Sequence, residues 1–165
     1  MPFKPSKPFK TTIEWVVILC IIVAISLWLN RHLLEKGTEL APLSLPDLQG
    51  NAQQIDWHDS RRTLIYAFAP WCGVCRISMP GLNLIQHDDV RVIVLAFDWQ
   101  NTEEVSQFIN DVGFQGQVLL ADSALAQTLT VDAYPTYYVI DEMGKIQHRD
   151  RGVSTPPGLW LRTRL

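Results

Sequence analysis

The chain has few residues that could gather around a metal ion. Its 165 residues include only three cysteines and four histidines, and the histidines lie far apart at positions 32, 58, 87 and 148. A structural zinc site needs four ligands, usually two close cysteine pairs or one pair with two spaced histidines. One such pair exists, Cys72 and Cys75, while Cys20 lies inside a distant apolar run. The sequence therefore predicts no metal site.

Clusters of basic residues are also lacking after the N-terminus. The net charge is −3, and Lys4, Lys7 and Lys10 are the only charged residues among the first ten, so the remaining chain carries −6. No basic run and no basic stripe interleaved with aromatic residues follows, which excludes nucleic acid as a partner. The hydrophobic fraction of 47% is that of a folded globular protein.

One long apolar run stands near the N-terminus. Residues 15–29 are apolar apart from Ser26, and Trp15 and Trp28 lie near the two ends, where indole rings favour the lipid headgroup region. Residues 11–30 together give about 30 Å of helix, enough to cross a bilayer. No small-x-small cleavage site follows the run. We therefore predict an uncleaved transmembrane anchor over residues 11–30 rather than a buried core helix.

The lysines ahead of the anchor predict its orientation. Basic flanks stay in the cytoplasm, so residues 1–10 are expected to form a cytoplasmic tail, with the body of the chain on the other side. In a bacterium this places a single-pass protein in the inner membrane with its body in the periplasm. Residues 31–40 are expected to be a polar linker, and residues 41–165 a single domain.

Within that domain, apolar runs alternate with helical patterns. Residues 63–69 and 90–97 are apolar without a polar face, which predicts strands covered on both sides. Asn101 and Glu104 have the spacing of a capping box at the start of a helix that should end at Gly113.

The last third of the chain predicts a short helix after Asp122, then a hairpin of residues 136–141 and 145–150. A final helix is expected to pack down through Leu159, Trp160 and Leu161. Strand–helix alternation followed by a closing hairpin predicts an α/β fold whose mixed sheet has helices on both faces.

The stretch "AFAPWCGVC" places the cysteine pair between a predicted buried strand and a predicted helix. In that context a Cys-x-x-Cys pair is typical of redox-active proteins. Cys72 should lie at the helix N-terminus, where free N–H groups stabilise a thiolate, and Cys75 should be buried one turn inside, placed to resolve a mixed disulfide. A purely structural bridge is the weaker alternative, because so small a loop removes little entropy from the unfolded chain.

The neighbours of the pair fit the redox hypothesis. Gly73 allows the backbone of a partner to approach closely. Trp71 is expected to shield the exposed sulfur and to offer a flat apolar contact surface. Pro80 is expected to kink the helix.

Two separated motifs resemble those of thioredoxin-like proteins. "WCGVC" (71–75) is similar to their active-site motif, and "YPTYYVIDEMGKI" (134–146) resembles the segment around their cis-proline. The similarity runs from about residue 41 to residue 152 and is greatest to the membrane-tethered periplasmic reductases of the TlpA/ResA type. Within that group, "GVCR" and the tail "GLWLRTRL" resemble the suppressor of copper sensitivity D branch, which implies a role in copper tolerance.

The resemblance implies a thioredoxin-like mixed sheet flanked by helices, preceded here by the transmembrane helix. It implies a redox-active disulfide between the catalytic residues Cys72 and Cys75, with no cofactor and no metal. Pro135 is expected to be the cis-proline, and Tyr134 to offer backbone groups to a substrate strand. The expected supporting residues of the active site are Trp71, Gly73, Val74, Tyr134, Pro135 and Thr136.

Two positions depart from the family pattern. Tyr66 stands where thioredoxins carry a buried aspartate, and Ser78 stands where the tethered reductases carry a glutamate. Both acids assist proton transfer at the buried thiol in those families, so this chain lacks the usual acid. Asp98, at the carboxyl end of the next strand, should lie on the same sheet edge as Cys75 together with Trp99, and is a candidate proton relay. The alternative is that Asp98 only begins a loop and helps to cap the next helix.

These observations predict a thiol–disulfide oxidoreductase tethered to the bacterial inner membrane, and a protein-disulfide reductase in particular. Its expected partners are protein or small-molecule disulfides as substrates and a membrane-embedded thiol protein as electron donor. The direction of electron flow follows from the resemblance alone, so an oxidase or isomerase stays open. A tethered Cu(I)-binding module also stays open, because soft thiolates suit Cu(I).

Overall fold

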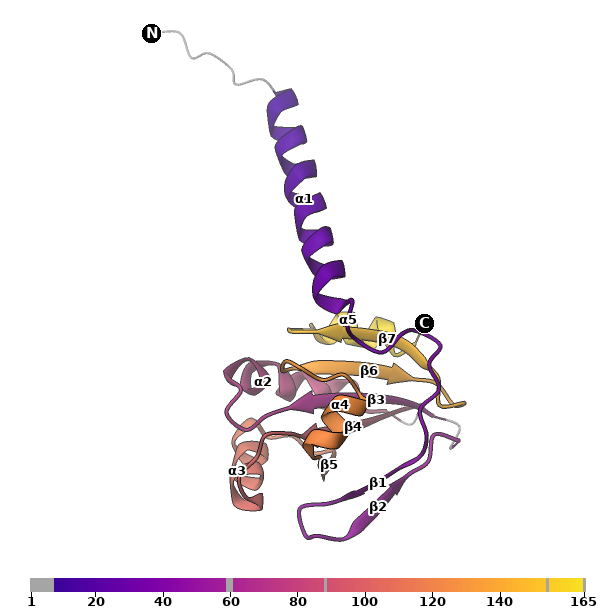
Figure 1. Cartoon of the computed structure of the whole chain (residues 1–165). Coiled ribbons are helices and arrows are strands. Elements are labelled where there is room, and N and C mark those ends of the chain that lie inside the picture. Colours follow the sequence, from indigo (N-terminus) through magenta and orange to yellow (C-terminus); the bar gives the residue numbers. More distant parts are fainter. Residues whose placement is uncertain (1–7, 59–60, 88, 154, 165) are drawn as a thin grey trace. The chain divides into compact units, whose positions relative to one another are not determined.

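The structure is a computed structural model that describes residues 8–58, 61–87, 89–153 and 155–164 (Figure 1). The chain divides into two compact units, Met1–His32 and Leu33–Leu165. Each is described by itself below.

The first unit consists of helix α1 (Pro8–Asn30), which contains all of the predicted anchor. Side chains 12–28 of α1 are exposed. No helix within the described residues is both long enough and apolar enough for a membrane crossing. Residues 1–7 of the predicted cytoplasmic tail lie outside the described residues.

The second unit is built on a mixed sheet of five strands in the order β5-β4-β3-β6-β7. Strands β3 (Arg62–Phe68), β4 (Val90–Ala96) and β5 (Gln117–Leu120) run parallel, whereas β6 (Thr136–Ile140) and β7 (Ile146–Arg151) form an antiparallel hairpin against β3. A separate two-stranded sheet consists of β1 (Leu43–Pro46) and β2 (Ala52–Ile55). This architecture confirms the predicted α/β mixed sheet with its closing hairpin.

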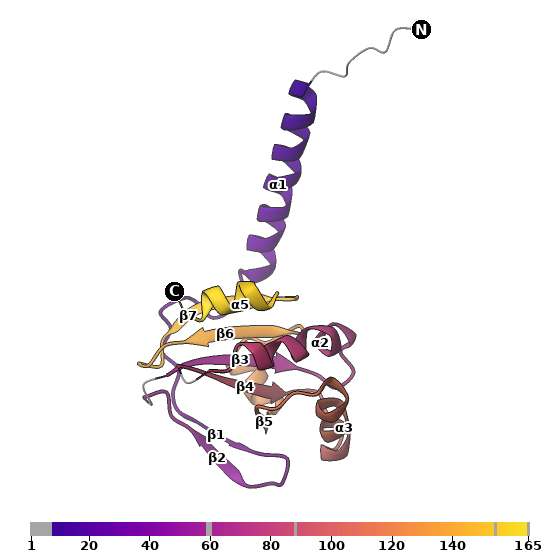
Figure 2. The same cartoon turned by 180° about the vertical axis from the view of Figure 1, so that it is seen from behind.

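Helices cover both faces of the sheet. One face carries α2 (Gly73–Ser78), the 3-10 helix η1 (Met79–Leu84), α3 (Thr102–Val112) and α5 (Pro156–Arg162), and the other carries α4 (Ser123–Thr128) with the segment that ends at Trp57 (Figures 1 and 2). Alternate residues of β3 point to opposite faces, so Tyr66 joins the first core and Ile65 the second. A strand buried on both faces needs an unbroken apolar sequence, which is why the sequence predicts β3.

The caps of α3 and α4 also follow the sequence. The Asn101 side chain accepts a hydrogen bond from the Glu104 amide at 2.9 Å, and Gly113 ends α3 in the left-handed conformation. The Glu104 carboxylate accepts from the amide of Gln100, one residue before the capping position of the predicted box. Asp122 caps α4 through the Leu125 amide.

The prediction for the final helix was wrong in part. Leu159 is buried, but Trp160 and Leu161 are 45% and 50% exposed. Residues four positions apart lie on the same side of a helical turn, so the buried residue that shares a side with Leu159 is Thr163, and the two residues after Leu159 point elsewhere.

The segment expected to be a linker contributes to the core of the second unit. Leu33 and Leu40 are buried, and the Leu40 amide donates a hydrogen bond to the Gly144 carbonyl at 2.9 Å. The segment has too few apolar residues to show a helical or strand periodicity, so the sequence does not predict this packing.

Candidate active site

The cysteine pair lies directly beyond the carboxyl end of β3. Cys72 and Cys75 form a disulfide with their Cα atoms 5.2 Å apart. The amide of Cys72 donates to the Ala69 carbonyl at 3.0 Å, which turns the chain from β3 into α2, and Cys72 is the residue that caps α2. Cys72 is 5% exposed and Cys75 is 0% exposed, so a partner can reach only the sulfur of Cys72.

The Cys72 sulfur accepts a backbone hydrogen bond. The amide of Cys75 donates to Cys72 Sγ at 3.1 Å. After reduction of the disulfide this N–H group stabilises negative charge on Cys72, because hydrogen bonds to an ionised acceptor are stronger than those to a neutral one. Arg76, which follows Cys75, pairs with Asp111 at 3.0 Å and lies over the ring of Phe108.

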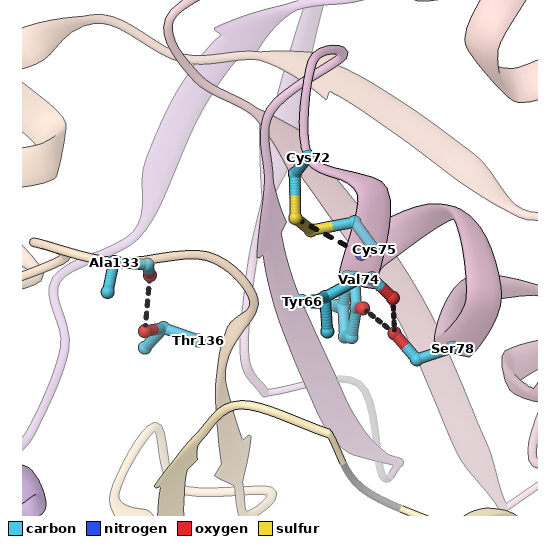
Figure 3. The surroundings of a disulfide bond; sticks show 7 residues. All are labelled: Tyr66, Cys72, Val74, Cys75, Ser78, Ala133 and Thr136. Carbon is cyan, nitrogen blue, oxygen red and sulfur yellow. Dashed lines mark hydrogen bonds between the residues drawn. A yellow bond between two sulfur atoms is a disulfide. The ribbon is translucent and has the colours of Figure 1, made fainter.

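The second sequence motif lies against the first. The Tyr134–Pro135 peptide bond is cis, as the resemblance implies, and the Thr136 hydroxyl donates to the Ala133 carbonyl at 2.8 Å (Figure 3). The rings of Trp71 and Tyr134 meet edge to face with centroids 5.7 Å apart. Since Trp71 precedes Cys72 and Tyr134 precedes Pro135, this aromatic contact joins the two motifs.

Asp98 belongs to the same site through Tyr134. Its backbone has a φ of +48°, a left-handed conformation that costs a non-glycine residue about 1 kcal/mol. Burial first, and then the negative charge of the nearby Asp98 carboxylate, raise the pKa of Tyr134. The Tyr134 phenol is therefore neutral at physiological pH. Trp99 packs beside the core that contains both cysteines and donates its indole N–H to the Ala121 carbonyl.

Tyr66 and Ser78, the two departures from the family pattern, are bonded to each other. The Tyr66 hydroxyl lies 2.6 Å from Ser78 Oγ, and the Ser78 hydroxyl donates to the Val74 carbonyl at 2.9 Å (Figure 3). Because Ser78 has one proton and uses it on Val74, Tyr66 is the donor in the first bond. Burial raises the pKa of Tyr66 to about 12. Sequence reasoning noted both residues only as missing acids and did not pair them.

The pair links β3 to the helix that carries Cys75. Tyr66 is 1% exposed on β3, and Ser78 ends α2 one turn after Cys75. Beyond Ser78 the chain continues as η1, with Pro80 in its first turn, so the helix changes type close to the expected kink. Within the described residues, no group of three or more His, Cys, Asp or Glu side chains could hold a metal ion.

The comparisons with known proteins agree with this geometry. A family model described as Redoxin matches residues 35–159. The chain is 25% identical over 162 residues to a thioredoxin-like protein of Haemophilus influenzae, covering 96% of this chain and 95% of that protein. It is 24% identical over 144 residues to the thiol:disulfide interchange protein DsbE of Pseudomonas aeruginosa, covering 83% of this chain and 79% of that protein.

Solved structures share the fold. One is a putative thiol:disulfide interchange protein DsbE from Chlorobium tepidum, with a TM-score of 0.70 and 23% identity over 78% of this chain and 95% of that one. Another is StoA from Bacillus subtilis, with a TM-score of 0.63 and 21% identity over 74% of this chain and 96% of that one.

The raised pKa of Tyr66 predicts how stability depends on pH. The fold favours the neutral phenol, so the stability that this residue supplies is complete below its ordinary pKa of 10 and is lost as the pH rises toward about 12. We expect the difference in unfolding free energy between the native chain and the Tyr66→Phe variant, measured by urea denaturation of the oxidised proteins, to shrink over this range. A pH-independent difference would contradict the assignment.

Proposed function

Since this chain belongs to the Redoxin family, we propose that it is a thiol–disulfide oxidoreductase that reduces disulfide bonds in proteins or small molecules. The observation that carries the proposal is the Cys72–Cys75 disulfide, in which Cys72 keeps a small exposed fraction while Cys75 is fully buried. Curated relatives that bear the name thiol:disulfide interchange protein support exchange partners of this kind.

The geometry assigns different steps to the two cysteines. In the reduced protein the Cys72 thiolate attacks a substrate disulfide, so that a Cys72–substrate disulfide forms and one substrate thiolate leaves. The Cys75 thiolate then attacks Cys72 Sγ, restoring the observed disulfide and releasing the second substrate thiol. The Cys75 amide stabilises the Cys72 thiolate that attacks in the first step. In the second step Cys72 is the sulfur attacked, and the substrate thiolate is the leaving group.

The supporting residues form the surface around Cys72 that a substrate would contact. Val74 is 42% exposed, and a Cβ added at Gly73 would meet no atom within 4 Å, so the loop is open to a partner backbone. The contact of Tyr134 with Trp71 holds the Pro135 loop beside the disulfide, where the backbone of Tyr134 can pair with a substrate strand. Thr136 stabilises that loop through its bond to Ala133.

We further propose that residues 11–30 anchor the protein in a bacterial inner membrane, with residues 1–10 in the cytoplasm and the thioredoxin-like domain in the periplasm. The sequence supports this topology: residues 15–29 are apolar apart from Ser26, with Trp15 and Trp28 near the two ends and three lysines ahead of the run. The described part of α1 does not by itself reach the length and apolarity of a membrane crossing, so the anchor stays a prediction from the sequence. Electrons then come from a membrane-embedded thiol protein. The "GVCR" motif and the tail support the copper-tolerance branch as the nearest group.

The redox potential tests the direction of electron flow. Related dithiols span about 150 mV, so the motif alone does not fix the direction. We expect the Cys20→Ser chain, equilibrated in glutathione buffers, to have a Cys72–Cys75 potential well below that of the glutathione couple. A potential well above the couple would overturn the reductase in favour of an oxidase or isomerase.

Removal of the resolving thiol tests the division of roles. In a Cys20→Ser background, Cys75→Ala should accumulate mixed disulfides that are visible on non-reducing gels, because Cys72 can attack but nothing releases the partner. Cys72→Ala in the same background should accumulate few, because Cys75 is buried. The reverse pattern would exchange the two roles.

A proton relay through Asp98 has its own test. Asp98→Asn keeps a residue of the same size that tolerates positive φ, but it removes the titrating carboxylate. If Asp98 carries the proton of Cys75, this variant should change the pH profile of disulfide reduction, whereas Tyr134→Phe should leave its shape unaltered. An unchanged profile for Asp98→Asn would exclude the relay and leave Asp98 as the residue that positions Tyr134.

A further inference from the structure

Most of the exposed large apolar side chains of the second unit lie on or beside three helices. Within the described part of residues 33–164, eight large apolar side chains are exposed. Six of them lie on or beside α2, η1 and α5: Trp71, Val74, Ile77, Leu84, Trp160 and Leu161. Single exposed apolar residues are ordinary, whereas a cluster of them marks a contact surface.

An apolar groove lies at the far end of this cluster. It has a volume of about 430 Å³ and is lined by Leu84, Ile85, Pro156, Pro157 and Trp160, with no charged side chain among them. The packing of α5 on η1 sets its width. A Cβ at Gly81 would lie 2.7 Å from Pro156 Cγ, so this approach requires glycine.

The chain connects the groove to the exchange site. Cys72 caps α2, α2 passes directly into η1, and Leu84 ends η1, so one helical run leads from Cys72 to a residue that lines the groove. This run is about 20 Å long, which an extended peptide covers with about six residues. Val74 and Ile77 are exposed along the way.

We propose that this groove, which we call the α2–α5 groove, binds an apolar stretch of the substrate polypeptide about six residues from the cysteine that joins Cys72. The inference rests on the proposed function, because it assumes that a substrate sulfur sits at Cys72. The groove has room for a few side chains, and its five lining residues are far fewer than the roughly 20–30 residues that each partner contributes to a stable protein interface. A flexible segment that already is held at Cys72 fits that size.

Activated peptides test the proposal on the full chain. The protein carries Cys20→Ser and Cys75→Ala, and the probes are short peptides with one cysteine bound to thionitrobenzoate. The Cys72 thiolate attacks the peptide sulfur, a Cys72–peptide disulfide forms, and coloured thionitrobenzoate leaves. In one set of peptides two leucines lie about six residues from the cysteine, on its N-terminal side in some peptides and on its C-terminal side in others. The matched set carries serines at the same positions.

Peptides with leucines on one side should react about tenfold faster than the serine peptides at sub-saturating concentration, as expected for partial burial of two leucine side chains. Leu84→Ser, a change of a 68% exposed residue, should abolish that preference. The matched control Met143→Ser, which alters a 61% exposed residue outside the groove, should retain it.

The outcomes separate this inference from the proposed function. Absence of thionitrobenzoate release from every peptide would count against thiol exchange itself. Equal rates for leucine and serine peptides, or a preference that survives Leu84→Ser, would overturn the groove alone. In sedimentation, a dimer that dissociates on Leu84→Ser would assign the groove to a second copy of the chain and would also overturn the proposal.

Discussion

The pairing of β6 against β3 decides where exchange can take place. In this antiparallel register Ala67 faces Thr136, so the cis-proline loop begins beside the point where β3 releases the chain toward Cys72. Both faces of β6 are buried, so a slip of one residue would move Tyr137 out of the core that holds the cysteines and into the core on the opposite face. In the observed register Tyr134, two residues before β6, meets Trp71 beside the disulfide.

The interior beside the buried thiol is polar but neutral. Tyr66 and Ser78 occupy it with two hydroxyl groups whose protons are both committed, one to Ser78 and one to Val74. Such a pair satisfies its own hydrogen bonds and avoids the cost of burying a charge, which a carboxylate at the same place would incur. The carboxylate assigned to the site, Asp98, is exposed, and its charge acts on Tyr134.

The features that sequence reasoning recovered are those with local signals. Strands β3 and β4, the Asn101 and Asp122 caps and the strand–cysteine–helix order all follow from residues adjacent in the chain. The Tyr66–Ser78 bond, the approach of Asp98 to Tyr134 and the burial of Leu33 and Leu40 join segments that only the folded topology brings together. The prediction that Trp160 and Leu161 are buried was wrong for a related reason. A short helix buries only one narrow face, and composition does not say which residues occupy that face.

Cys72 and Cys75 are themselves members of the hydrophobic core, packed in the same cluster as Tyr66, Met79 and Phe108. Opening the disulfide therefore changes the contents of that core, and folding and redox state form one thermodynamic cycle. A core substitution that destabilises the dithiol form more than the disulfide form makes the protein a stronger reductant, by about 30 mV for each 1.4 kcal/mol of difference. The packing around the two sulfur atoms thus contributes directly to the redox potential of the Cys72–Cys75 pair.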